Sequence, residues 1–324
     1  MKKTLILLFI VVAFGAAWST GWYFVAGQVE QALAIAKTRL QSQDKLLQCP
    51  NEEIGGFPFR ISVTCDEMSY FDNQKGFFLE AGALRSAAQA YQPGKAVVEL
   101  DGPAVLTVAH SETFDVQWKS LRASLFAGLG GVEKFSTVGR ELSLVSTRLD
   151  RDAVTLEELQ LHGRKSGEND VDLAMSSGKV VSTKRLWPDF DLAVNVRFEK
   201  IYDQLSRRPD LIRIARNQGL EGQLTGLDYH SLEGGKVSVA GPMKIDTRGL
   251  LSGNFNISAS ELNALVRSLG RAFPDRQEMF EQAETAAALL SSASKDGKVQ
   301  VPVTVSNGQA KIGLIPIGTI PPLF

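Results

Sequence analysis

An apolar stretch near the N-terminus constrains this chain more than any other feature of its sequence. Lys2 and Lys3 are followed by no charged side chain until Glu30. Residues 5–26 would extend roughly 33 Å as a helix at ~1.5 Å per residue, which is enough to cross a bilayer. Because cytoplasmic flanks are rich in lysine, the sequence predicts that the N-terminus lies in the cytoplasm and the rest outside it.

Two interpretations of this stretch are open. The first is an uncleaved transmembrane anchor over residues 1–27 that leads into a stalk helix over 28–47, because apolar residues continue at helical spacing. The second is a cleaved signal peptide, since residues 17–19 (Ala-Trp-Ser) form an acceptable small-x-small cleavage site. The anchor is favoured, because the apolar core of a signal peptide usually covers about 7–15 residues and this one continues through Val25.

The chain has only two cysteines, Cys49 and Cys65. Outside the cytoplasm, a pair on neighbouring predicted strands favours a disulfide, which would stabilise the fold by roughly 3 kcal/mol in the chain-entropy model. Two cysteines without nearby histidines do not complete a zinc site, and their spacing is far from that of a Cys-x-x-Cys redox pair. The sequence therefore predicts a structural disulfide.

Short runs of alternating apolar and polar residues follow the stalk and predict half-buried antiparallel strands. These runs cover 97–108, 141–147, 153–161, 191–198, 237–245 and 299–305. Helical patterns are fewer, at 121–129, at 201–217 and within 261–290. The sequence therefore predicts an α+β fold, in which the transmembrane helix is followed by a β-rich domain over 48–324 with extensive antiparallel sheet and a few packed helices.

Asn307-Gly308 predicts the clearest local structure, a hairpin with a two-residue type I′ turn. Pro302 in its first strand favours a sheet edge or a bulge. The predicted register places three pairs on one face: Val305 with Ala310, Val303 with Ile312, and Val301 with Leu314.

A weak internal repeat is a further interpretation. Similar apolar patterns occur at about 95–130 and 235–270, and each contains a Gly-Pro pair, at Gly102-Pro103 and at Gly241-Pro242. Such degenerate matches also arise by chance in β-hairpins. If the repeat is real, the domain has two similar halves.

The most distinctive motif lies between the cysteines and comprises Gly56, Phe57, Pro58, Phe59 and Arg60, preceded by a further glycine. The glycines allow a tight turn, and the proline fixes the entry to the next strand. The two phenylalanines could contact lipid, but packing at the turn is the favoured interpretation.

Arg60 in this motif could bind a phosphate headgroup. The favoured interpretation is an ion pair with a nearby carboxylate, either Glu52, Glu53 or Asp66.

No catalytic, metal or cofactor pattern is recognisable. His110, His162 and His230 are far apart in sequence and lie in no metal or triad motif. Residues 292–295 match Ser-x-x-Lys but lack the companion motifs of penicillin-binding proteins, and no nucleotide-binding glycine loop or calcium loop occurs. A net charge of -1 and a pI near 6.4 indicate no nucleic-acid partner. We therefore expect no enzyme activity and no cofactor.

The chain resembles the domain-of-unknown-function 2125 family of alphaproteobacterial envelope proteins. The anchor, the Gly-Phe-Pro-Phe-Arg motif between Cys49 and Cys65, and the ending Gly-Leu-Ile-Pro-Ile-Gly at 313–318 carry this resemblance. More remotely, the architecture resembles the AsmA-like envelope proteins. That resemblance implies a curved sheet with an apolar groove that handles lipid, although this chain is short for a conduit that spans the periplasm.

Three hypotheses about function follow. The favoured one is a non-enzymatic, single-pass protein of the inner membrane, with its bulk in the periplasm, that binds or handles lipid in a groove lined by positions such as Leu106, Ile245 and Ile257. The alternative is an envelope scaffold or assembly factor that binds another protein through an exposed strand edge. An enzyme with an unrecognised site is the third.

Overall fold

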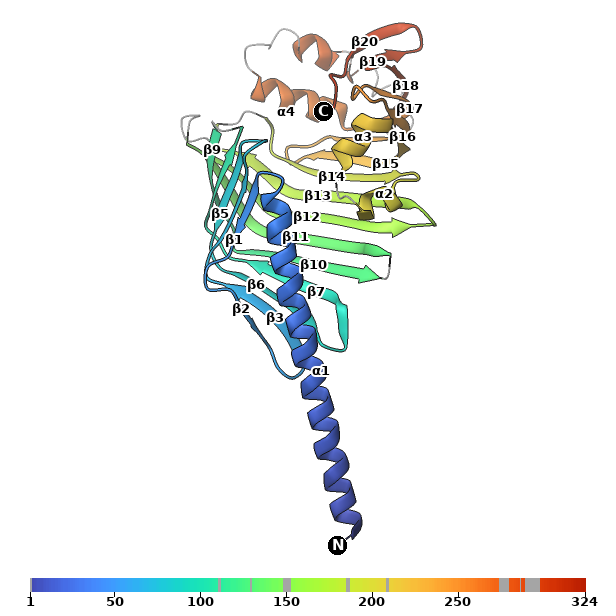
Figure 1. Ribbon diagram of the computed structural model, residues 1–324. Helices are drawn as coiled ribbons and strands as arrows, with labels where there is room; N and C mark the ends of the chain where they lie inside the picture. The colour runs from blue at the N-terminus through green and yellow to red at the C-terminus, as the bar shows by residue number, and fades with distance from the viewer. Residues whose placement is uncertain are drawn as a thin grey trace. The chain divides into compact units, whose positions relative to one another are not determined.

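The computed structural model describes residues 2–109, 112–128, 130–147, 153–184, 187–207, 210–273, 280–285, 287–288 and 298–324. A long N-terminal helix is followed by a large antiparallel sheet of many strands with a few helices (Figure 1), which confirms the predicted α+β class. The chain divides into two compact units, which the sequence did not predict. The first comprises residues 1–126 and 144–151, and the second comprises 127–143 and 152–324.

Helix α1, Lys2–Gln41, is continuous through the predicted anchor and stalk. Its apolar first half is long and apolar enough to cross a membrane. The helix ends at Gln41 and not at residue 47, because Asp44 adopts a left-handed conformation with φ of 57° and strand β1 begins directly after it. The predicted stalk is therefore the second half of the same helix.

The first unit contains two antiparallel ladders, and the chain passes repeatedly from one to the other. One ladder pairs strands β1 (Lys45–Gln48), β4 (Met68–Asp72), β5 (Phe77–Ala81), β8 (Ala104–Val108) and β9 (Glu112–Gln117) in that order. The other pairs β2 (Glu53–Gly55), β3 (Arg60–Cys65), β6 (Leu84–Gln89), β7 (Gln92–Leu100) and β10 (Ser120–Gly128).

The predicted helix at 121–129 is wrong, because residues 120–128 form strand β10. Its apolar spacing fits a helix locally, but its backbone pairs with β7 from Leu121 opposite Leu100 to Phe126 opposite Lys95. Pairing with a neighbouring strand overrides the local pattern, as tertiary context often does for short apolar runs.

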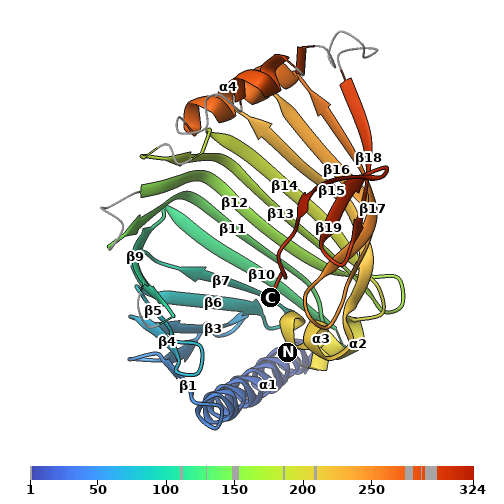
Figure 2. The ribbon, with the colours of Figure 1, turned by 90° about the horizontal axis from the view of Figure 1, so that it is seen from above.

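The second unit is an antiparallel meander in which each strand from β12 to β19 pairs with the next one in sequence (Figure 2). Its strands are β11 (Gly131–Ser146, whose last residues belong to the first unit), β12 (Ala153–Ser166), β13 (Asp170–Ser182), β14 (Phe190–Phe198), β15 (Leu220–Ser231), β16 (Lys236–Ile245), β17 (Leu251–Ser260), β18 (Lys298–Ser306), β19 (Gln309–Ile312) and β20 (Ile315–Thr319). Helices α2 (Tyr202–Arg207) and α3 (Leu211–Gln218) connect β14 to β15, and α4 (Leu262–Ala272) follows β17.

Helices α2 and α3 close one end of the meander's apolar face. Ile201, Tyr202 and Ile214 from this connection form a buried cluster with Phe198 and Ile245 of the sheet. Ile245 is only 6% exposed, so the prediction that it lines an open groove is wrong at this position. The physical reason is the long β14–β15 connection, which folds two short helices onto the strand ends.

Helix α4 packs at the opposite ends of these strands, beside the β15–β16 turn. A Cβ on Gly235, which has a φ of +95°, would lie 2.6 Å from Leu265 Cβ, so the helix approaches the turn as closely as glycine allows. The buried hydroxyls of Ser231 and Ser268 form a hydrogen bond of 3.0 Å. The helix predicted within 261–290 therefore exists over 262–272, and part of the remaining range lies outside the described residues.

The C-terminal hairpin turns at Asn307 and Gly308, which both have positive φ as a type I′ turn requires. The predicted pair of Val305 with Ala310 is confirmed. The pair of Val301 with Leu314 is wrong, because β19 ends at Ile312 and the chain turns into β20. The ladder between β18 and β19 ends at Thr304 and Lys311, one residue short of the predicted pair of Val303 with Ile312.

Strand β18 pairs with β17 from Lys298 to Val305, but with β19 only from Thr304 to Ser306. Its outer edge over 298–303 pairs with no described strand. Pro302 lies on this stretch, in agreement with the edge-strand interpretation.

The two segments of the predicted repeat differ in secondary structure. Gly102-Pro103, a cis peptide, separates β7 from β8, whereas Gly241-Pro242 lies inside the uninterrupted strand β16. The first segment ends in strand β10 and the second in helix α4. The two similar halves stay a prediction, and these two segments share no structure beyond their first strands.

Candidate functional site

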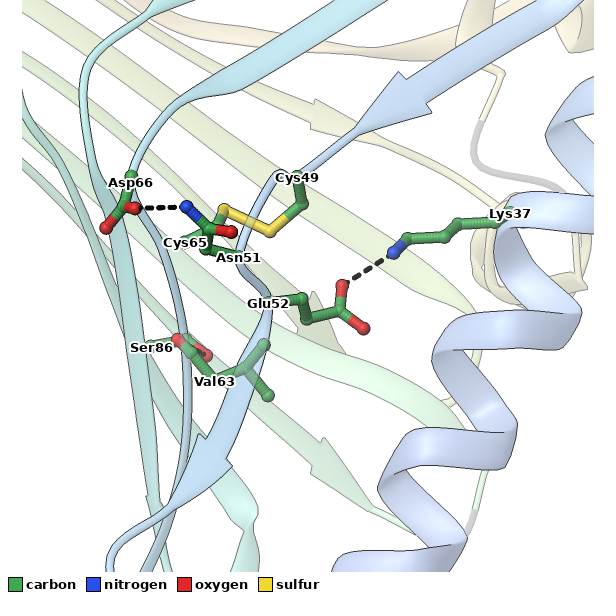
Figure 3. Close-up of a disulfide and its surroundings, with 8 residues drawn as sticks. All are labelled: Lys37, Cys49, Asn51, Glu52, Val63, Cys65, Asp66 and Ser86. Carbon is green, nitrogen blue, oxygen red and sulfur yellow. Dashed lines mark hydrogen bonds and ion pairs between the residues drawn. A yellow bond between two sulfur atoms is a disulfide. The ribbon is translucent and has the colours of Figure 1, made fainter.

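A disulfide joins the two ladders of the first unit. Cys49 follows β1 and Cys65 ends β3, and their sulfur atoms are bonded with a Cα–Cα distance of 5.4 Å (Figure 3). Asn51 donates a hydrogen bond of 2.7 Å to Asp66 beside the bond. The structure therefore pairs the two cysteines that the sequence predicts to pair.

The Gly-Phe-Pro-Phe-Arg motif forms the turn between β2 and β3. Gly56 has a φ of +99°, and a Cβ there would lie 2.8 Å from the carbonyl oxygen of Arg60. The Arg60 amide donates a hydrogen bond of 3.1 Å to the Gly56 carbonyl. Glycine is therefore required at this position both by backbone conformation and by space.

This turn docks against helix α1. The indole N–H of Trp18 donates to the Pro58 carbonyl at 2.9 Å, and that of Trp22 donates to the Arg60 carbonyl at 2.8 Å. The ring of Phe57 lies edge-on to Trp22 with ring centroids 5.5 Å apart. Sequence reasoning did not identify the turn as the binding partner of these two tryptophans.

The aromatic residues of the turn have different environments. Phe57 packs on Trp22 and Tyr23 while it stays 48% exposed, so the packing interpretation is confirmed for this residue. Phe59 is 70% exposed, so the same interpretation is wrong for it.

Arg60 does not form any of its predicted ion pairs. Glu52 pairs with Lys37 at 2.6 Å, and Asp66 accepts a hydrogen bond from Asn51 (Figure 3). Among the described residues, no carboxylate lies within 4.0 Å of the Arg60 guanidinium, and this side chain is exposed.

An apolar hollow of about 610 Å³ lies where the turn meets α1. The helix contributes small side chains between large ones, and the sheet contributes the turn and the adjacent β6–β7 turn. Its lining residues are Phe14, Gly15, Trp18, Ser19, Phe57, Pro58, Phe59 and Tyr91. All belong to the first unit, and nearly all the surface they present is apolar.

The second unit has an unbroken line of apolar side chains across seven strands. Directly opposed residues in antiparallel strands lie on the same face of a sheet. The pairings connect Leu161, Met175, Val194, Leu227, Val239, Ile257 and Val301, one residue from each strand from β12 to β18. We call these seven residues the central apolar row.

Side chains of the central apolar row are not closed off from solvent. Leu161 is 41% exposed and Met175 is 36% exposed, while the other five are partly exposed. Five of the seven also pack against the buried cluster that includes Leu224, Phe255 and Val303, namely Val194, Leu227, Val239, Ile257 and Val301.

A second row runs beside the first on the same face. It connects Leu159, Ser177, Leu192, Tyr229, Val237, Ala259 and Val299 through direct pairings. Its polar groups are the buried hydroxyl of Ser177 and the hydroxyl of Tyr229, which hydrogen-bonds with Ser231. Ile257 therefore lies in a partly exposed apolar strip, whereas Ile245 lies in the closed core at its end. That Ile257 lines a groove for lipid stays a prediction.

The opposite face of the same strands is polar. Asp172 accepts hydrogen bonds from Arg197 at 2.7 Å and from Arg164 at 3.1 Å. The hydrogen bond from Arg197 is the main cause that lowers the pKa of the Asp172 carboxyl, against a smaller opposing effect of burial. The sheet thus has one charged, hydrated face and one apolar face.

The described histidines do not come together. His162 contacts Gln160 at 3.0 Å, His230 lies 3.6 Å from the Asp191 carboxylate, and His110 lies outside the described residues, as do residues 292–295. In the part of the chain that the structure describes, no group of three or more His, Cys, Asp or Glu side chains is placed to hold a metal ion.

The second half of α1, the disulfide-bracketed turn and the C-terminal strands all fall within one family model. The model for uncharacterized proteins conserved in bacteria, DUF2125, matches residues 22–321. The chain belongs to this family. No curated protein matches it.

Proposed function

We propose that this DUF2125 protein is a non-enzymatic protein of the inner membrane, anchored by α1, that holds lipid acyl chains on the apolar face of its second unit. The observation that carries the proposal is the central apolar row with the second row beside it. Soluble proteins rarely leave a contiguous apolar strip of this length without a ligand or partner.

The dimensions of the strip suit an acyl chain. Neighbouring strands lie about 4.8 Å apart, so a row across seven strands is about 29 Å long. One leaflet of a bilayer contributes about 15 Å of hydrocarbon, half of a core of about 30 Å. An extended acyl chain would thus lie along the row, at right angles to the strands, with its methylenes against methyl groups.

The orientation of the anchor supports a periplasmic location for both units. Lys2 and Lys3 precede the apolar helix, and Trp18, Trp22 and Tyr23 cluster at its other end, where aromatic side chains favour the membrane interface. We propose that the protein is single-pass, with its bulk in the periplasm. The AsmA-like resemblance agrees with lipid handling and stays a prediction.

Photo-crosslinking in the bacterial membrane tests the proposal. A benzophenone amino acid placed at Met175, in the central apolar row, should form adducts with phospholipid that mass spectrometry identifies. The matched control is Asn256, which is exposed on the polar face of β17. Equal lipid labelling at both positions, or labelling at neither, would contradict the proposal.

A second function, an envelope scaffold, has one specific observation in its favour. The outer edge of β18 over 298–303 leaves backbone groups without a described partner strand, and such an edge can bind an added strand. A crosslinker at the exposed Gln300 would then yield adducts with a protein, and the Met175 position would yield none with lipid.

A further inference from the structure

The turn of the Gly-Phe-Pro-Phe-Arg motif presents large apolar side chains to solvent. Phe59 is 70% exposed and Tyr91, on the neighbouring β6–β7 turn, is 63% exposed. The two turns are adjacent because β3 pairs with β6, and the Ala90 amide donates to the Phe59 carbonyl at 2.9 Å. Both turns lie beside the apolar half of α1, which itself exposes Phe14.

We propose that these two turns insert into the outer leaflet beside α1, and that the apolar hollow between them and the helix holds an acyl chain of a leaflet phospholipid. The inference rests on membrane anchoring by α1. It is independent of the lipid strip proposed for the second unit, because every residue involved belongs to the first unit.

The level of the turn along α1 supports insertion. The hydrogen bonds from Trp18 to Pro58 and from Trp22 to Arg60 hold the turn level with helix residues 18–22. If the hydrocarbon core begins at Leu5, Trp18 lies about 20 Å into it at ~1.5 Å per residue. A core of about 30 Å then ends about 10 Å beyond Trp18. The tip therefore reaches roughly the depth at which interfacial apolar residues lie, about 5–10 Å below the headgroups.

The backbone of the turn also suits a dry environment, where every polar backbone group needs a partner. The carbonyls of Gly56, Pro58, Phe59 and Arg60 all accept hydrogen bonds, from an arginine amide, two indoles and an alanine amide. Pro58 has no N–H that needs a partner. A turn exposed only to water would not require side chains from another element to bind its carbonyls.

The hollow suits the acyl chain of a phospholipid, and Arg60 suits its headgroup. The hollow of about 610 Å³ has the size of a ligand pocket and almost no polar lining. Arg60 is exposed and has no carboxylate in ion-pair distance among the described residues, so its guanidinium is available for a phosphate at the headgroup level.

Spin labels on single added cysteines in the full-length protein test the inference, since Cys49 and Cys65 are already bonded. The variants are Phe59→Cys, Phe9→Cys on the exposed lower part of α1, and Lys75→Cys on the exposed β4–β5 turn near the far end of the helix. The protein is reconstituted in vesicles of phosphatidylcholine and phosphatidylglycerol. Collision rates with oxygen, which concentrates in lipid, are compared with those for a water-soluble nickel complex.

The Phe59→Cys label should resemble the Phe9→Cys label, with a high oxygen-to-nickel ratio, while the Lys75→Cys label gives a low ratio. A lipid-exposed Phe9→Cys label together with a water-exposed Phe59→Cys label would overturn the inference and leave the anchor intact. Water exposure at both positions would overturn the inference together with the anchor. Neither result bears on lipid at Met175, so the two proposals fail separately.

Discussion

One face of the second unit's sheet contains both a closed core and an open strip, and a carboxylate introduced into each should have very different effects. Ile245→Glu places the charge in the cluster under α2 and α3, where the side chain is 6% exposed. Loss of the packed isoleucine costs about 2–5 kcal/mol, and burial of an unpartnered carboxyl adds at least about 1–3 kcal/mol. The expected loss is therefore at least about 3 kcal/mol of a total of about 5–15 kcal/mol.

Met175→Glu places the same group in the central apolar row, where the methionine is 36% exposed. The carboxylate can reach water there, so the expected loss is only about 1 kcal/mol, mostly from lost apolar contact. Asn256→Glu on the polar face is the matched control and should change stability by less than about 0.5 kcal/mol.

Thermal unfolding of the full-length variants in detergent measures the contrast. For a unit of this size, 1 kcal/mol corresponds to about 2–4 °C in Tm. Ile245→Glu should therefore lower Tm by about 6 °C or more, and Met175→Glu by about 2–4 °C. Equal losses for both variants would show that the central apolar row is a closed core, and the reasoning about an open strip would be refuted.

Three further predictions concern the disulfide, the docked turn and the polar face. Replacing Cys49 and Cys65 by serine should cost roughly 3 kcal/mol in unfolding free energy, and thiol labelling of the denatured, non-reduced wild type should detect neither cysteine. Trp22→Phe keeps the apolar contact but removes the hydrogen bond to the Arg60 carbonyl. It should therefore cost about 1 kcal/mol and increase proteolysis at the turn, and unchanged proteolysis would contradict the docking. The pKa of Asp172 is lowered in the fold, so the stability it contributes is complete above about pH 4. That stability is lost as pH falls through the lowered pKa, so Asp172→Asn should flatten the decline of Tm below pH 4.

The sequence predicted those parts of the fold that depend on local pattern. The charge-free run after Lys3 is a helix because nothing in it interrupts helical geometry, and Asn307-Gly308 forms its turn because both residues accept positive φ. The helix predicted at 121–129 is wrong for the converse reason. The periodicity of this segment is ambiguous, and the strand that decides its structure, β7, is distant in sequence.

The candidate site was only partly predictable. The disulfide follows from the presence of just two cysteines. The exposure of Phe59, and the lack of a described carboxylate within ion-pair distance of Arg60, depend instead on how the turn meets α1. The central apolar row could not be recognised in the sequence, because it takes one residue from each strand and its members are far apart in sequence. Period-two alternation with strand lengths assigns each residue to a face, but the bulges near Thr225 and Lys179 shift the register in ways that sequence alone does not fix.

The sequential pairing of β12 to β18 has a consequence for how the second unit comes into being. Each strand finds its partner in the strand made immediately before it, so contact order is low for a sheet of this size. At a synthesis rate of roughly 5–20 residues per second, each hairpin has ample time to close before the next strand emerges. During synthesis, the strand made last is the growing, unpaired edge of the meander, where another chain could pair. Each new strand covers the edge before it, until β18 is the last strand of this series.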